Sequence, residues 1–316
     1  MTDTPIPADL AGCWPKLARE AGLPAAGWRF ELVSRRDDRA RARNVWRVRD
    51  GARSVALKHV SRPVDPAAFL AEIEALMQAG ARFPDGFPRI LAVDAAAQAV
   101  VIEWVEGVTL HEALGRRAAD HAALLAVAGA WVARLHRAGF DERRMFRPHH
   151  SVAHLTRLAD EAATGRRTVP RLEAWLRATR ALAAMSRDYE GRETVSSEGH
   201  GDLNLRNLMV DGTAASGLDP RPVKAVPVGH DIARLAVHYG ALRAPDAACE
   251  GPLPGVDLTG FFAGYDLVGP DDPSIGFLCR MRILVDWQTL PEERRMTLAE
   301  HRRLAGLMRL AARAFG

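Results

Sequence analysis

Apolar and polar residues alternate along much of the first third of the chain, a pattern that predicts a β-rich region. A short helical pattern over residues 8–22, interrupted near Pro15, precedes it. A second helical pattern spans residues 66–80, with apolar side chains at Phe69, Ile73 and Leu76 on one face. The predicted strands cover residues 28–33, 44–49, 54–60, 90–94 and 99–107, the last running into a connector.

Helical periodicity dominates the remainder of the chain. Its strongest example spans residues 121–136, which we expect to form the spine of a helical region. One exception is a predicted hairpin, in which the turn Asp211–Gly212 joins the strand 208–210 to an apolar stretch ending at Asp219. Residues 139–150 are polar and predict a connection. The other predicted helices cover residues 110–114, 151–162, 170–186, 258–265, 274–290 and 297–315.

These patterns predict an α+β fold with two lobes. The β-rich N-terminal lobe is expected over residues 1–106, and the mainly helical C-terminal lobe over residues 107–316. A chain of 316 residues with 48% hydrophobic residues is long enough to build two real cores.

Two acids and an amide occur at spacings that suit phosphoryl transfer. Asp202 precedes Asn207 by a four-residue loop, and the predicted hairpin returns Asp219 to the neighbourhood of Asn207. Phosphoryl transfer requires a carboxylate that orients and deprotonates the attacking hydroxyl, and oxygen ligands for the magnesium ion that bridges the phosphates. We therefore expect Asp202 to be the base, and Asn207 and Asp219 to be the metal ligands.

The segment His200-Gly-Asp202-Leu-x-x-x-Asn207, followed by Leu-Asp219, resembles the aminoglycoside phosphotransferase and choline kinase group of the protein-kinase-like fold. Asp219 takes the place of the Asp in the Asp-Phe-Gly motif of protein kinases, with Pro220 instead of Phe. The resemblance implies a two-lobed kinase fold, ATP and Mg²⁺ as cofactors, and a small-molecule hydroxyl acceptor.

The same resemblance implies a nucleotide site in the N-terminal lobe. Lys58 lies in Val-Ala-Leu-Lys, which is similar to the Val-Ala-Ile-Lys of kinase strand three, and implies a contact with the α/β-phosphates. Glu72 is the expected ion-pair partner of Lys58, with Glu74 as the alternative, because the sequence does not show which of them faces inward. In the connector, main-chain groups of Glu103 and Val105 are expected to bind adenine.

Two features depart from the related kinases. The expected phosphate-covering loop, residues 34–43, contains no glycine, so arginines in it are expected to contact phosphate instead. Arg206 stands in the catalytic loop, where it either neutralises the transferring phosphate or points outward with a structural role.

Further acidic residues follow Asp219. Asp231 resembles the family's Asp that caps a helix and braces the catalytic loop, so we assign it a structural role. Asp286 is the best single candidate for binding a cationic acceptor. Asp271 and Asp272, which precede Pro273, are further candidates, but helix capping is favoured for them. The remaining carboxylates considered for acceptor binding are Asp257 and Asp266.

Composition and charge exclude several other classes of protein. The formal charge is +4, but no long Lys/Arg block with interleaved aromatic residues appears, so no nucleic-acid partner is expected. The three cysteines lack the spacing of a zinc site. No targeting segment or membrane span is evident, so a cytoplasmic enzyme without membrane contact is the default expectation.

The sequence thus predicts an ATP- and Mg²⁺-dependent small-molecule kinase. A nucleotide-binding pseudokinase with a regulatory or scaffold role stays open because of the glycine-free loop, and a basic nucleic-acid-binding module rests only on arginine content. Acceptor identity, the choice between ATP and GTP, and oligomeric state are left undetermined.

Overall fold

The computed structural model describes residues 8–24, 27–37, 42–51, 53–222 and 224–316. The chain divides into two compact units: Met1–Gly107 with Ser216–Pro222, and Val108–Ala215 with Val223–Gly316. The short segment Ser216–Pro222, which the sequence pattern places in the helical lobe, thus packs with the first unit. Its Ser216 hydroxyl donates a hydrogen bond to the Gly86 carbonyl at 3.4 Å.

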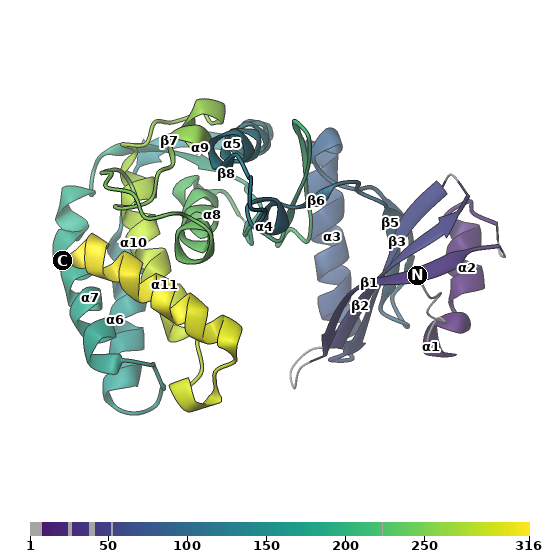
Figure 1. The fold of residues 1–316 in the computed structure, drawn as a ribbon, viewed down its shortest axis with the longest axis horizontal. Coiled ribbons are helices and arrows are strands. Elements are labelled where there is room, and N and C mark those ends of the chain that lie inside the picture. Colours follow the sequence, from purple (N-terminus) through teal and green to yellow (C-terminus); the bar gives the residue numbers. More distant parts are fainter. Residues whose placement is uncertain (1–7, 25–26, 38–41, 52, 223) are drawn as a thin grey trace. The chain divides into compact units, whose positions relative to one another are not determined.

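The first unit is built on a five-stranded antiparallel sheet (Figure 1). Lys58 lies on the central strand β3, opposite Val45 of β2 on one side and Val100 of β5 on the other. Lys58 is therefore not on an edge strand. The sheet order is β1-β2-β3-β5-β4, formed by β1 (Arg29–Asp37), β2 (Ala42–Asp50), β3 (Arg53–Arg62), β4 (Ile90–Asp94) and β5 (Ala99–Glu103).

Helices lie against both faces of this sheet (Figure 1). On one face, α1 (Ala8–Ala11) and α2 (Trp14–Glu20) share a buried cluster with alternate strand residues, among them Trp46 and Leu57. Successive strand residues point to opposite faces, so Lys58 faces the other side, where α3 (Pro66–Arg82) lies. Pro15 sits in the first turn of α2, a position that proline tolerates.

The expected phosphate-covering loop, residues 34–43, is largely strand. Residues 34–37 belong to β1 and pair with residues 42–45 of β2, while residues 38–41 lie outside the described part of the chain. Backbone hydrogen bonding between two long strands extends the hairpin through a polar, arginine-rich stretch that gives no hydrophobic signal. The prediction of a loop over Ser34–Asp37 was therefore wrong.

The second unit is mainly helical. Helix α8 packs against α10 and α11, while α5 packs against α9. The helices are α4 (Leu110–Ala113), α5 (His121–Ala138), α6 (His149–Ala163), α7 (Leu172–Met185), α8 (Gly229–Leu242), α9 (Thr259–Gly264), α10 (Pro273–Gln288) and α11 (Leu298–Phe315). Short 3₁₀ turns cover Pro84–Gly86 in the first unit and Ser186–Asp188 and Glu293–Arg295 in the second.

Two small sheets complete the fold. One has the order β10-β9-β6, formed by β6 (Val108–Thr109), β9 (Leu208–Asp211) and β10 (Ala214–Gly217). The other has the order β11-β8-β7, formed by β7 (Phe140–Met145), β8 (Glu193–Ser197) and β11 (Val226–Pro227).

Strand β7 replaces the predicted polar connection. All of its residues are exposed, so the sequence carries no alternating pattern, and the strand is held by backbone pairing to β8 and an Arg143–Glu193 ion pair of 3.0 Å.

None of the helices in the described ranges is long and apolar enough to cross a lipid bilayer.

Candidate active site

The loop from Ser197 to Leu208 carries the main catalytic candidates. It joins β8 to β9, and its backbone turns sharply at Gly201, whose φ of +76° lies in the left-handed region that favours glycine. Gly199 approaches Asp231 so closely that a Cβ there would lie 2.2 Å from a carboxylate oxygen. The glycines on either side of His200 thus allow the chain to fold tightly around one carboxylate.

Asp231 holds this loop from the first turn of α8. Its carboxylate accepts hydrogen bonds from the backbone N–H groups of His200 (2.6 Å) and Gly201 (3.0 Å), and His136 Nε2 lies 3.4 Å away. Burial acts to raise the pKa of Asp231, but the hydrogen bonds and charges of His136 and His200 outweigh it and lower the pKa to about 2. The expected bracing role is confirmed. The capping role is wrong, because Val228 is the N-cap and no side chain caps the helix.

We expect Asp231→Asn to lower the free energy of unfolding by about 2–4 kcal/mol, because an amide offers a donor where the carboxylate accepts two backbone N–H groups in a buried site. Urea unfolding at pH 7 measures this. Asp266→Asn is the control: Asp266 forms an exposed ion pair with Arg137, of the kind that contributes little. Equal losses in the two variants would contradict the bracing role.

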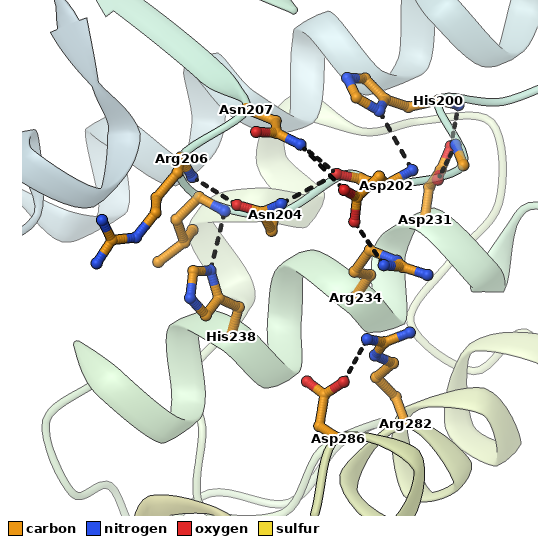
Figure 2. A network of polar contacts seen from close by, with 12 residues as sticks. His200, Asp202, Asn204, Arg206, Asn207, Asp231, Arg234, His238, Arg282 and Asp286 are labelled. Carbon is orange, nitrogen blue, oxygen red and sulfur yellow. Dashed lines mark hydrogen bonds and ion pairs between the residues drawn. The ribbon is translucent and has the colours of Figure 1, made fainter. Parts of the chain in front are cut away.

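The Asp202 side chain is fixed by two partners (Figure 2). Arg234 Nη1 donates to Asp202 Oδ1 at 2.5 Å, and the Asn207 amide nitrogen donates to the Asp202 carbonyl at 2.9 Å and to Asp202 Oδ2 at 3.4 Å. The side chain of Asp202 is 29% exposed and that of Arg234 is 28% exposed, so solvent reaches the pair. The carboxylate thus keeps Oδ2 only weakly engaged, as a base requires.

Arg206 does not contribute a cation to Asp202. It is exposed, and its guanidinium points away from the Asp202 carboxylate (Figure 2). Its backbone N–H instead donates to the Asn204 side chain at 2.9 Å, which shapes the turn. The role proposed for Arg206, to neutralise the transferring phosphate, stays a prediction beside the structural one.

The ion pair between Arg234 and Asp202 was not predicted from the sequence. Arg234 lies on α8, one turn after Asp231, so one helix face carries both the brace of the loop and the cation on Asp202. The i,i+3 spacing of Asp231 and Arg234 was visible in the sequence, but nothing indicated that the second residue reaches back 32 positions.

A second contact from α8 supports the loop. His238 Nδ1 accepts the Leu205 N–H at 3.1 Å, and its ring stacks on His111 at 5.8 Å between centroids. Arg243 Nη2 lies 2.7 Å from His111 Nε2. Burial is the main cause that lowers the pKa of His238 to about 3 and that of His111 to about 4, with nearby arginines adding to it.

These two histidines predict a pH dependence of stability. Their pKa values are lower in the folded than in the unfolded chain, so between pH 6.5 and 4 the unfolded chain binds more protons and stability falls as the pH falls. We expect a loss of at most about 1.4 kcal/mol per histidine per pH unit. His238→Asn keeps an acceptor for Leu205 and should flatten the slope, measured by urea unfolding at pH 7, 6, 5 and 4. An unchanged slope, equal to that of the exposed control His301→Asn, would contradict the assignment.

In the first unit, Asp219 is surrounded by cations. Lys58 Nζ contacts Asp219 Oδ1, and Arg43 Nη1 lies 2.8 Å from Oδ2. Burial raises the pKa of Asp219, but the charges of Lys58 and Arg43 outweigh it, so the pKa lies well below its ordinary value. The residue also has a φ of +54°, a left-handed conformation that is uncommon outside glycine and tends to occur at functional sites.

The expected ion pair between Lys58 and Glu72 is replaced by two others. Lys58 pairs with Asp219, and the Glu72 carboxylate accepts from Arg221 Nη1 at 2.7 Å. Arg221 follows Asp219 by two positions, so its guanidinium reaches Glu72 while the Asp219 carboxylate takes Lys58. Glu72 is half-buried and Glu74 is exposed, so of the two candidates Glu72 faces inward.

The connector after β5 contains the two residues expected to bind adenine. Glu103 ends the strand, and its side chain accepts from Arg89 Nε at 2.6 Å and Arg89 N–H at 3.0 Å, which lowers its pKa. This pair anchors the connector, and Val105 follows it, half-buried. Trp104 packs under the guanidinium of Arg47 at 4.5 Å from the ring centroid.

Asn207 and Asp219, the two predicted metal ligands, each carry an oxygen of the kind that magnesium prefers. Asn207 donates through its amide nitrogen to Asp202, which turns its amide oxygen away from that residue (Figure 2). Asp219 offers an ionised carboxylate in the first unit. Magnesium prefers such oxygen ligands and takes few from the protein, completing its shell with phosphate oxygens and water. Among the described residues, no group of three or more His, Cys, Asp or Glu side chains is placed to hold a metal.

Three of the acidic residues considered for a cationic acceptor already have other partners. Asp286 is 3% exposed and pairs with both Arg282 and Arg303, the latter at 3.0 Å. Asp272 caps α10, as predicted, by accepting from the Ser274 N–H. Asp257 accepts from the Thr259 N–H at 2.9 Å. Asp286 is thus neutralised from two helices, and its role as an acceptor anion is not supported.

Comparisons with known proteins agree with this fold. Solved structures of small-molecule kinases match nearly the whole chain, so the chain has the protein-kinase-like fold. The phosphotransferase enzyme family matches residues 33–251, more than half of the chain, and the chain belongs to that family. No curated protein matches the chain closely enough to count as a relative.

Three of the solved structures show how general the similarity is. A choline/ethanolamine kinase family protein from Mesorhizobium loti is 16% identical, with coverage of 97% of this chain and 98% of that one, and a TM-score of 0.58. Spectinomycin phosphotransferase in complex with ADP and spectinomycin is 11% identical, with coverage of 98% and 99% and a TM-score of 0.54. An aminoglycoside phosphotransferase from Streptomyces rimosus is 20% identical, with coverage of 89% and 100% and a TM-score of 0.53.

Proposed function

We propose that this phosphotransferase is an ATP- and Mg²⁺-dependent kinase that transfers the γ-phosphate to a hydroxyl of a small molecule. The observation that carries the proposal is the fixed Asp202 carboxylate, held by Arg234 and Asn207 on a loop that Asp231 braces. The solved structures that share this fold include complexes with ADP and with a non-hydrolysable ATP analogue, which supports nucleotide binding by this chain.

Each residue has a defined task in this reaction. Asp202 Oδ2 accepts the proton of the acceptor hydroxyl as its oxygen attacks the γ-phosphorus, while Arg234 keeps the carboxylate oriented. Lys58 contacts the α/β-phosphates, and main-chain groups of Glu103 and Val105 bind the base. Asn207 and Asp219 would each supply an oxygen ligand to Mg²⁺, and the bound ion would supply neutralisation of charge on the phosphate oxygens.

Glu72 has a positioning role in this scheme. Glu72 binds Arg221, which lies two residues after Asp219, and so helps to hold the backbone of Asp219 in its left-handed conformation. This role takes the place of a direct hold on Lys58.

The test is ADP formation with Mg²⁺ and ATP over hydroxylated acceptors: aminoglycosides, amino alcohols, sugars and hydroxy acids. Acceptor-dependent ADP formation that requires Mg²⁺ supports the kinase. Tight Mg²⁺–ATP binding by calorimetry without turnover on any acceptor would contradict it and favour a nucleotide-binding pseudokinase.

A further inference from the structure

The second unit contains a cavity of about 290 Å³ whose lining includes neighbours of Asp202 but not Asp202 itself. Gly201, the residue before Asp202, lines it, and so does Arg234, whose guanidinium pairs with Asp202. Most of the apolar wall comes from α10, through Leu278, Met281 and Val285. A molecule in this cavity therefore lies next to the base, and the cavity is the natural seat of the acceptor within this unit.

Two arginines stand out in the polar lining of this cavity. Arg234 and Arg282 both line it, and their guanidinium groups lie close to each other (Figure 2). Each lowers the pKa of the neighbouring His230, after the larger effect of desolvation, and Arg234 also lowers the pKa of Arg282. Two like charges are thus held close together at the cavity wall.

The carboxylates nearby do not saturate these guanidinium groups. Asp286 is shared between Arg282 and Arg303, so two positive charges meet one negative charge. The buried Arg282 Nε–H has no acceptor among the described residues. Asp202 accepts from a single nitrogen of Arg234. Both arginine side chains therefore have N–H groups that can donate further hydrogen bonds.

The cavity also lacks a carboxylate that is available to bind an amine. Among the described residues that line it, the acidic one is Asp231, and its two oxygens already accept the backbone N–H groups of His200 and Gly201. A cationic acceptor would meet two guanidinium groups at the cavity wall and no lining carboxylate that is free of other partners, which costs binding free energy.

We infer that the acceptor is a compact hydroxylated anion, whose carboxylate or phosphate group is bound by Arg282 and Arg234 while its hydroxyl reaches Asp202. The inference rests on the proposed function and narrows its acceptor class. Guanidinium groups bind carboxylate and phosphate through paired N–H donors, and both groups present the oxygens needed. A volume of about 290 Å³ lies at the lower end of ordinary ligand pockets, which suits an acceptor of about the size of one sugar ring.

The test compares acceptors that share a skeleton and differ in charge. Glucosamine, glucose and glucuronate form one set, and ethanolamine, ethylene glycol and glycolate a second. Glycerate and glycerol 3-phosphate separate a carboxylate from a phosphate ester. We expect kcat/KM of the anionic member to exceed that of the cationic member by roughly 10- to 100-fold, the effect of one or two charge-assisted hydrogen bonds.

Variants then assign the effect to Arg282. Arg282→Gln should raise the KM for the anionic acceptor by roughly tenfold or more and leave the KM for ATP within twofold, and Arg282→Lys should recover part of the loss. The exposed Arg302→Gln is the matched control. Circular dichroism and melting temperature check that each variant folds. If a variant does not fold, the ranking of acceptors by the unmodified enzyme still tests the inference.

The outcomes separate this inference from the proposed function. A cationic acceptor with the highest kcat/KM, and no effect of Arg282→Gln on its KM, would overturn the inference and leave the kinase intact. Absence of turnover on every acceptor would overturn the kinase and the inference together.

Discussion

Asp202→Asn should lower kcat by roughly 10²- to 10⁴-fold, the usual contribution of a positioned general base, while the affinity for Mg²⁺–ATP stays within about threefold. The amide cannot accept the hydroxyl proton, but it occupies the same volume between Asn207 and Arg234. Steady-state ADP formation gives kcat, and calorimetry gives the nucleotide affinity.

The control for this variant is Asp211→Asn, a matched change at an exposed position at the end of β9. It removes the same charge from the same segment without touching the loop. A kcat for Asp202→Asn within threefold of the control would show that Asp202 is not the base.

Asp219→Asn should weaken the binding of Mg²⁺–nucleotide by at least about tenfold, because changes even to the outer partners of a metal site commonly cost 10- to 100-fold. The affinity for metal-free nucleotide should not fall in the same way. Lys58 and Arg43 both pair with the Asp219 carboxylate, and removal of its charge leaves them free to bind phosphate. Calorimetric titration with ADP, in the presence of Mg²⁺ and of a chelator, measures both.

Asp50→Asn is the matched control, because Asp50 is an exposed residue at the Asp50–Gly51 turn and asparagine suits that turn equally well. Equal weakening of Mg²⁺-bound and metal-free ADP by Asp219→Asn would contradict a metal-ligand role. It would indicate instead a general disturbance of the first unit.

Local patterns in the sequence predicted most of the elements. Segments such as residues 121–136 and 297–315 repeat apolar residues at helical spacing, and the structure has α5 and α11 there. Strand β7 and the extended β1–β2 hairpin were not predicted because most of their residues are polar and none is fully buried at the extension, so only pairing with a neighbouring strand indicates that they are extended.

The site was predictable where one short segment contains it. The spacing between Asp202 and Asn207 can be read directly from the sequence of the loop. The bracing role of Asp231 was predicted from the motif around it, which lies a short distance along the chain. Partners across long separations were not predictable: Lys58 meets Asp219 over 161 positions, and Asp286 is neutralised by Arg303 from another helix. Ion pairs between elements depend on packing, to which a single sequence gives no direct access.

The most direct test of the kinase assignment is the fate of the γ-phosphate. Phosphorus NMR of a reaction with Mg²⁺, ATP and the best acceptor should show ADP and an equal amount of a new phosphate monoester, and Asp202→Asn should show neither. ADP accompanied only by inorganic phosphate, or product formation unchanged in Asp202→Asn, would contradict transfer to an acceptor hydroxyl through Asp202.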